Sequence, residues 1–275
     1  MGVASSEILD KVAGLLVCPA CHASLRMETS PVACTGCSRT YAISDDVIQF
    51  APGEAWQPPA TQETSIPYQR KFMGDEGAAQ YRRLYEGTLS KRLTTRREKS
   101  MLTRLLATQG HCSSILDIPC GNGRVSSPIA AATDLLLEAD IGPGQVMLGR
   151  QMAEWKTPTV WMTASAFSIP LRDNAVDGTV CVRLMHHLPS IEEQERLVAE
   201  LLRVSRRFVL LTFFDSQSLK QILSRLCGRK QRRHRLSLRA IASLAEMHGG
   251  RLAMTPRLFP IGTGQRYALL VKNQA

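Results

Sequence analysis

From residue 113 onward the chain alternates between short apolar runs and segments whose apolar residues recur at helical spacing. The apolar runs predict strands at residues 113–117, 134–140, 158–163, 175–182 and 207–213, with two further extended stretches at 251–256 and 266–272. The helical spacing predicts helices at residues 124–132, 143–154, 191–204 and 237–248. This alternation predicts an α/β fold with a parallel sheet that carries helices on both faces and binds ligands at the carboxyl ends of its strands.

The pattern before residue 113 is different. Apolar residues at helical spacing predict one helix over residues 6–17 and two more over 76–85 and 91–106. Residues 51–67 contain four prolines and few apolar residues, which disfavours both helix and sheet. We therefore expect two domains, residues 1–57 and residues 58–275, the second with helices across 70–110 and its core across 111–275.

The composition of the 275 residues, 44% apolar and 21% charged, is typical of a globular soluble protein. No apolar run reaches the roughly 18–20 residues that a membrane span requires. The N-terminus lacks the basic region and separate apolar core of a secretion signal. We expect a cytoplasmic protein without a transmembrane segment.

The formal net charge of +10 has a local origin. Eight arginines and lysines, with no acid, lie in residues 220–239, and the rest of the chain carries only +2. Leu219, Ile222, Leu223 and Leu226 have helical spacing, so we expect part of this segment to be an amphipathic helix. Its charges suit RNA phosphates, an acidic lipid headgroup or a phosphorylated metabolite; a solvated helix face is the alternative.

Two Cys-x-x-C pairs, Cys18 with Cys21 and Cys34 with Cys37, stand twelve residues apart. Each pair can direct two thiolates to one ion, and four thiolates give the tetrahedral coordination that zinc prefers. Because about forty residues bury too little apolar surface to fold alone, the metal would supply much of the stability. We expect a structural zinc, since protein fills all four positions; a redox dithiol is the alternative.

Residues 115–124, which read ILDIPCGNGR, are the most specific motif of the larger domain. Asp117 closes the apolar run, and Gly121 and Gly123 follow before the helical pattern begins. A strand, tight turn and helix of this kind presents backbone N–H groups to a ligand, and glycine lets the backbone approach it closely. The run is not the dinucleotide fingerprint, because the third glycine is missing and Pro119 stands at the position of the first.

This spacing, Asp-x-Pro-x-Gly-x-Gly, resembles the first motif of class I S-adenosylmethionine-dependent methyltransferases, an acid followed by G-x-G-x-G. The resemblance implies a seven-stranded, mostly parallel, doubly wound sheet with one antiparallel strand, and S-adenosylmethionine as the cofactor. It implies that Asp117 orients the methionine ammonium of the cofactor, and that Pro119, Gly121 and Gly123 line the site. The cysteine region resembles the zinc ribbons that precede or partner RNA-modifying and other methyltransferases.

The resemblance extends to two later segments and to the helices before the core. Asp140 ends the second strand, where an acid can accept hydrogen bonds from both ribose hydroxyls; a helix N-cap is the alternative. Next to it, Ile141 is expected at the cofactor, and Ser165, Ala166 and Phe167 are expected to hold the adenine. Ser165 replaces the acid usual there, which predicts a weaker bond to the adenine amino group.

In such enzymes the two helices before the core lie across the cofactor like a lid, and an aromatic such as Tyr81 or Tyr85 often lines the site. Packing of these rings onto the core is the alternative.

After the fourth strand, Arg183 leads into a Leu-Met-His-His-Leu-Pro segment that resembles the region of small-molecule methyltransferases facing the transferred methyl group. Arg183 is accordingly expected at the cofactor, and His186 or His187 as a catalytic base. Methyl transfer from a sulfonium is an in-line displacement for which a protein supplies alignment, exclusion of water and sometimes a base. Histidine titrates near neutrality, but the pair could instead cap and pack the next helix.

Three functional classes stay open. The His-His-Leu-Pro segment favours a methyltransferase with a small-molecule or lipid-like acceptor, which the basic segment would suit if it is anionic, and this is the interpretation that we adopt. The cysteines and the basic segment favour an RNA base methyltransferase, resembling bacterial ribosomal-RNA guanine methyltransferases with N-terminal zinc fingers. A non-catalytic adaptor with a degenerate cofactor site would account for Pro119 and Ser165.

Overall fold

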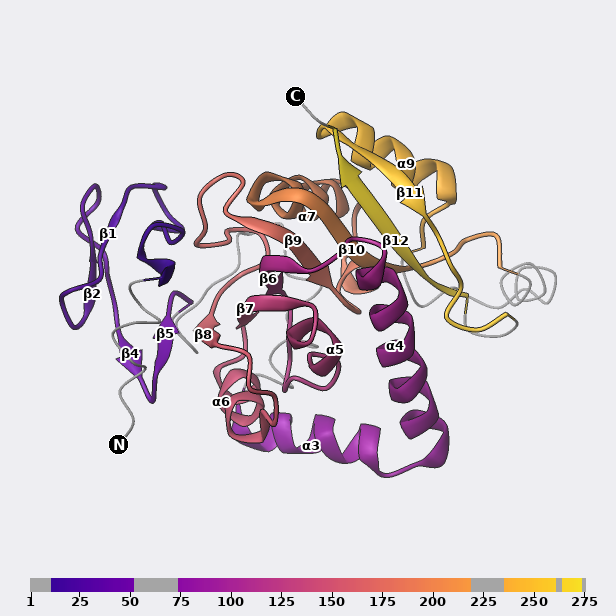
Figure 1. Cartoon of the computed structure of the whole chain (residues 1–275), viewed down its shortest axis with the longest axis horizontal. Helices are drawn as coiled ribbons and strands as arrows, with labels where there is room; N and C mark the ends of the chain where they lie inside the picture. Colours follow the sequence, from indigo (N-terminus) through magenta and orange to yellow (C-terminus); the bar gives the residue numbers. More distant parts are fainter. Residues whose placement is uncertain (1–10, 52–73, 219–234, 261–263, 274–275) are drawn as a thin grey trace.

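The computed structural model describes residues 11–51, 74–218, 235–260 and 264–273. Its centre is a mixed, mostly parallel sheet of nine strands in the order β11-β12-β10-β9-β6-β7-β8-β5-β4 (Figure 1). The parallel part consists of β6 (Cys112–Asp117), β7 (Thr133–Asp140), β8 (Thr159–Thr163), β9 (Val176–Cys181) and β10 (Ser205–Phe214). β12 (Gln265–Lys272) pairs antiparallel with both β10 and β11 (Gly250–Met254). All seven strands predicted from the hydrophobic pattern are therefore present.

Two further strands widen the sheet beyond β8, so the expectation of seven strands is wrong. β5 (Val47–Gln49) pairs parallel with β8, and β4 (Ile43–Ser44) pairs antiparallel with β5. Asp45 and Asp46 both have positive φ in the hairpin between them, as a tight two-residue turn requires. Strands of two or three residues carry no periodicity that a sequence pattern can reveal. They form here because the edge of β8 offers unpaired backbone groups.

The helices follow the predicted pattern with two exceptions. The helix expected over 6–17 ends at Ala13, because residues 14 and 15 form a turn and Leu16 and Val17 form β-bridges. α3 (Asp75–Glu86) and α4 (Leu89–Ala107) precede the core, and α6 (Pro143–Met152), α7 (Ile191–Val204) and α9 (Leu238–Met247) lie between or after strands. The helix expected over residues 124–132 is shorter, because α5 covers only Ser127–Ala130. Residues 121–126 form turns instead, starting from Gly121 and Gly123 with positive φ.

Helices cover both faces of the sheet. On one face, Leu102 and Leu106 of α4 and Ile129 of α5 pack with Ile115 of β6. Leu116, the next residue of β6, belongs to the cluster on the other face, which α7 and α9 cover. α3 packs against α6 and connects to α4 (Figure 1).

The N-terminal region has its own small sheet but shares the main core. β1 (Leu25–Arg26), β2 (Val32–Cys34) and β3 (Thr40–Tyr41) form an antiparallel sheet. Val12, Leu16, Val32 and Tyr41 are buried in the same cluster as Leu171 of the larger domain. This region, which we call the four-cysteine unit (residues 11–41), is therefore packed onto the α/β core, beside β8 (Figure 1).

Several predicted features lie wholly or mainly outside the described residues. They are the first part of the helix over 6–17, the proline-rich linker with the boundary at 57, the amphipathic helix over 219–226, and most of the basic segment. Of that segment's eight cations, Arg235 and Arg239 are described. Among the described residues, no helix combines the length and apolar character that crossing a bilayer demands.

Candidate cofactor-binding site and four-cysteine centre

The chain turns sharply after Asp117, the last residue of β6, at the carboxyl end of the parallel strands. Gly121 and Gly123 have φ angles of +56° and +73°, in the left-handed region that glycine adopts without strain. A Cβ at Gly123 would also lie 3.3 Å from the ring of Trp155. Pro119 stands in the turn between Asp117 and Gly121, after a cis peptide bond. The motif found in the sequence thus forms a strand and a tight turn, with glycine where the backbone requires it.

A hydrogen bond holds this turn to Asp140, the last residue of β7. The N–H of Gly121 donates to Oδ2 of Asp140 at 2.9 Å, and the N–H of Gly142 donates to Oδ1 at 2.8 Å. Burial raises the pKa of Asp140, against the effect of these two hydrogen bonds. Each carboxylate oxygen retains a lone pair for a further donor, such as a ribose hydroxyl. Gly142 is the N-cap residue of α6, so the carboxylate is not committed to capping that helix.

Asp117 and Glu138 form a second acidic group, beneath the turn. They are directly paired in the register of β6 and β7, and both are 0% exposed. Ser126 donates to Oδ2 of Asp117 at 3.0 Å, whereas Oδ1 of Asp117 has no hydrogen-bond partner. The Glu138 carboxyl lies beside the Ser126 hydroxyl and the Cys120 thiol. Burial raises the pKa of Asp117 to about 7 and raises that of Glu138 as well.

Buried acceptors without donors are costly. Three buried acids at one end of two neighbouring strands therefore suit a ligand that brings donors and positive charge.

The segment expected to hold adenine follows β8 and adjoins Asp140. The N–H of Ala164 donates to the carbonyl of Asp140 at 2.9 Å, which places both chain segments at the same end of the sheet. Ser165 accepts a hydrogen bond from the N–H of Phe167 at 3.2 Å, so its hydroxyl stabilises a local turn. Ala166 is buried, and Ile141 and Phe167 are half-buried. The structure thus brings the expected ribose and adenine residues together.

Arg183 and the two histidines lie at the end of β9, the strand beside β6. Arg183 has φ of +68°, an unusual conformation for a residue with a side chain. Its N–H donates to Thr212 at 2.7 Å. His186 is 5% exposed, and its ring meets that of Phe214 edge-on at 4.7 Å between centroids, while the half-buried His187 ring lies 4.1 Å from that of His186.

Sequence reasoning missed the residue to which the Arg183 side chain binds. Glu98 of α4 is 0% exposed and pairs with Arg183 at 2.7 Å and with Arg124 at 2.6 Å. Gln265 also donates to it, at 3.2 Å. The guanidinium carbons of Arg124 and Arg183 lie 4.4 and 5.4 Å from the centre of the Tyr85 ring. We call Glu98, Arg124, Arg183 and Tyr85 the arginine cluster.

A signal for Glu98 does exist in the sequence. It is the one acid in the basic run 91–99, and it stands three and four residues before the buried Met101 and Leu102. It therefore falls on the apolar face of its helix, where an acid requires a partner. Tyr85 is buried against the two guanidiniums, as the packing alternative for the lid aromatics expects, and a place for it at the cofactor stays a prediction.

The four cysteines converge as their spacing predicts. Their sulfur atoms all lie within 4.8 Å of one another, with Cys18 and Cys37 at 3.7 Å and Cys21 and Cys34 at 3.4 Å. A regular tetrahedron with Zn–S bonds of about 2.3 Å has sulfur separations of about 3.8 Å, so the donor set fits this ion. The N–H groups of Cys37 and Gly36 donate to the Cys34 sulfur and lower the pKa of its thiol. Tyr41 contacts the Cys18 sulfur at 3.0 Å through its hydroxyl.

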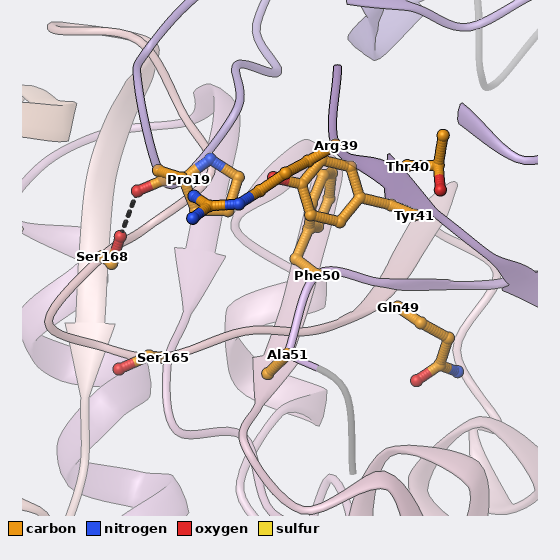
Figure 2. A pocket seen from close by; sticks show the side chains of 10 residues that line it. Pro19, Arg39, Thr40, Tyr41, Gln49, Phe50, Ala51, Ser165 and Ser168 are labelled. Carbon is orange, nitrogen blue, oxygen red and sulfur yellow. Dashed lines mark hydrogen bonds between the residues drawn. The ribbon is translucent and has the colours of Figure 1, made fainter. Parts of the chain in front are cut away.

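A cavity of about 450 Å³ lies between the four-cysteine unit and the segment after β8 (Figure 2). The Tyr41 and Phe50 rings, 5.0 Å apart between centroids, form part of its wall, and Ser165 and Ser168 face it from the larger domain. Arg39 reaches over it from the four-cysteine unit (Figure 2). The interface between the four-cysteine unit and the larger domain is therefore not continuously packed.

Comparison with known proteins agrees with this geometry. Residues 116–211, from the end of β6 to β10, match the family model described as a methyltransferase domain. The matched segment is similar to a methyltransferase domain. The match begins one residue before Asp117 and includes Asp140, the segment after β8, and the two histidines. No curated protein matches the chain.

Solved structures share the fold at low sequence identity. Magnesium protoporphyrin IX methyltransferase of Synechocystis PCC 6803 with bound SAH is 18% identical, with a TM-score of 0.63, over 76% of this chain and 100% of that chain. The N-methyltransferase NodS of Bradyrhizobium japonicum WM9, with S-adenosyl-l-homocysteine, is 13% identical, with a TM-score of 0.57, over 77% and 99%. A complex of the Haloferax volcanii Trm112 methyltransferase activator with a methyltransferase gives 12% identity and a TM-score of 0.55, over 73% and 97%. At these identities the likeness describes the fold of the methyltransferase domain.

Proposed function

We propose that this protein transfers a methyl group from S-adenosylmethionine to a small-molecule or lipid-like, anionic acceptor. The observation that carries the proposal is the cluster of buried acids at the carboxyl ends of β6 and β7. There one oxygen of Asp117 has no hydrogen-bond donor, Glu138 has only the Ser126 hydroxyl and the Cys120 thiol beside it, and the Asp140 carboxylate is held by the Gly121 turn. A cofactor that carries an ammonium, a sulfonium and two ribose hydroxyls supplies positive charge and further donors to this cluster.

Each residue has a distinct role in this proposal. Asp117 holds the methionine ammonium and Asp140 the ribose hydroxyls. Gly121, Gly123 and Pro119 leave room for close approach of the backbone, and Ile141, Ser165, Ala166 and Phe167 enclose the adenine. When bound, the cofactor supplies an electrophilic methyl group that an in-line nucleophile can accept. The chain aligns the two reactants and excludes water.

The histidines are the candidate bases for the acceptor. His186 is almost fully buried, with its ring against Phe214, whereas His187 is half-buried in the same turn after β9. We assign proton removal to His187, with His186 supporting its ring. The arginine cluster lies at the end of the same strand, so Arg183 holds α4 near the reacting groups through Glu98. A place for Arg183 at the cofactor stays a prediction.

A labelling experiment tests the function. The protein is incubated with S-adenosylmethionine labelled on its methyl group and a cell extract, and RNA, lipid and small-molecule fractions are separated. We expect label in the lipid or small-molecule fraction, and none with the Asp140→Ala variant. Label in RNA would replace the proposed acceptor by a nucleic acid, and no transfer to any fraction would contradict the proposal.

An RNA acceptor is the second candidate, favoured by the convergence of the four cysteines and by the basic segment. RNA binding would weaken steeply with salt, by about one unit of log–log slope for each neutralised phosphate. The zinc that we assign to the four cysteines is structural in either case, because they fill all four coordination positions.

A further inference from the structure

The four-cysteine unit is bound to one particular part of the methyltransferase domain, the segment of residues 164–172. Residues 14–19 of the unit, which include Cys18, run alongside this segment. The N–H of Val17 donates to the carbonyl of Pro170 at 3.1 Å, and the N–H of Arg172 donates to that of Leu15 at 3.0 Å. Leu16 and Leu171 form a β-bridge between these contacts and are both buried.

A side-chain hydrogen bond joins the first Cys-x-x-C pair to this segment. The Ser168 hydroxyl donates to the carbonyl of Pro19, the first of the two residues between Cys18 and Cys21 (Figure 2). The position of Pro19 depends on the loop that closes around the cysteines, because the N–H of His22 donates to the Cys18 carbonyl at 2.8 Å. An ion that holds Cys18 and Cys21 together would therefore also fix the acceptor of the Ser168 hydrogen bond.

Ser168 is also part of the turn expected to enclose adenine. Its N–H donates to the carbonyl of Ser165 at 3.1 Å, and Ser165 in turn receives the N–H of Phe167. The far end of the segment is held by α7, where Glu200 accepts the N–H of Ile169 at 2.8 Å and Arg203 donates to the Leu171 carbonyl at 2.7 Å. Because a cavity of about 450 Å³ opens beside Ser165 and Ser168, individual hydrogen bonds matter more here than continuous packing.

We propose that the four-cysteine unit positions the adenine of the cofactor, and that Ser168 is the positioning residue through which it acts. This rests on the proposed function, since it assigns the segment at residues 164–167 to adenine. The unit is then a structural part of the cofactor site and not an independent appendage. Loss of the metal would loosen the turn and weaken cofactor binding, while the reacting end of the site, at β6 and β9, keeps its geometry.

The test compares Ser168→Ala with two other variants of the full-length, zinc-loaded protein. Ser168→Thr keeps the hydroxyl. Thr157→Val removes a similar hydrogen bond, from a hydroxyl to the Ala130 carbonyl at 2.8 Å, just before β8 and at the opposite end of that strand from Ala164. Calorimetry with S-adenosylmethionine should show a Kd about three- to tenfold higher for Ser168→Ala, as expected for one lost hydrogen bond. Ser168→Thr and Thr157→Val should stay within about twofold of the wild type.

Two further measurements separate positioning from general destabilisation. In Ser168→Ala, KM for the cofactor should rise while kcat changes by less than about twofold, and hydrogen exchange should accelerate at residues 165–171. Removal of zinc with a chelator should raise the Kd at least as much. Equal Kd values for wild type, Ser168→Ala and chelated protein would overturn the positioning proposal and leave the proposed function intact. If the zinc-loaded wild type does not bind S-adenosylmethionine at all, both proposals are wrong.

Discussion

Asp117 and Glu138 stand directly opposite each other on the neighbouring strands β6 and β7, both without exposure to solvent. Two buried carboxyl groups at this separation cannot easily ionise together, and burial already raises the pKa of each. This relationship makes the ends of β6 and β7 receptive to a cation and makes both stability and binding depend on pH.

The first prediction concerns this pH dependence. The pKa of Asp117 rises from an ordinary value of 3.8 to about 7, so between pH 4 and 7 the folded protein retains a proton that the unfolded chain has lost. The contribution of Asp117 to the free energy of unfolding therefore decreases as pH rises through this window. Asp117→Asn should remove that decrease, so its Tm relative to the wild type should increase from pH 5 to pH 7. Thermal unfolding at several pH values measures this, and parallel curves for the two proteins would argue against it.

Cofactor binding should show the opposite trend with pH. If ionised Asp117 holds the methionine ammonium, the affinity of the wild type for S-adenosylmethionine should rise as pH passes through about 7. In Asp117→Asn the affinity should be lower and should not show this rise. Calorimetry at pH 6, 7 and 8 provides the measurement, and an equally steep rise in the variant would exclude the assigned role.

The third prediction concerns Asp140. Asp140→Asn keeps the size of the side chain but removes the charge that accepts the N–H groups of Gly121 and Gly142. The proposed hydrogen bonds from the ribose hydroxyls to this carboxylate would weaken as well. Because hydrogen bonds to a charged group contribute about 1.5–3 kcal/mol, the Kd for S-adenosylmethionine should rise by about tenfold or more. Asp134→Asn is the matched control, because Asp134 lies near the other end of β7 with its side chain 72% exposed. Similar Kd values for the two variants would contradict the prediction.

The arginine cluster gives a prediction about stability. Glu98→Ala leaves Arg124 and Arg183 without their buried carboxylate, which typically costs about 3–5 kcal/mol in the free energy of unfolding. Glu86→Ala, in an exposed pair with Arg82 four residues away, should cost about 0.5 kcal/mol or less. Urea unfolding of both variants measures the difference. A cost for Glu98→Ala no larger than that for Glu86→Ala would show that the buried pairs do not hold α4 in place.

The four cysteines give a prediction about metal content. The purified protein should carry one zinc per chain, and Cys34→Ser should reduce the zinc content and lower Tm by several degrees. Cys112→Ala is the control, since Cys112 is buried in β6, away from the four-cysteine cluster. Elemental analysis and thermal unfolding provide the readouts. Full zinc occupancy in Cys34→Ser would exclude the predicted coordination.

Local spacing in the sequence was sufficient for much of the fold. The strand at Cys112–Asp117, the glycines of its turn and the two Cys-x-x-C pairs were all visible, because each depends on residues only a few positions apart. The helix expected over 124–132 was too long because the left-handed glycines extend the turn, and apolar periodicity does not register φ angles. The roles of Asp117, Asp140 and the histidines follow from resemblance and stay predictions.

By itself, the sequence determined the alternation of strands and helices, the acid that ends each of β6 and β7, and the spacing of the four thiolates. These are properties of side-chain period and chain geometry over short distances. Only the tertiary structure decided that Glu98 meets Arg183, that residues 43–49 extend the central sheet, and that Pro19 receives the Ser168 hydroxyl. Such contacts join residues 85 or 149 positions apart. They depend on how whole elements pack, which no local pattern encodes.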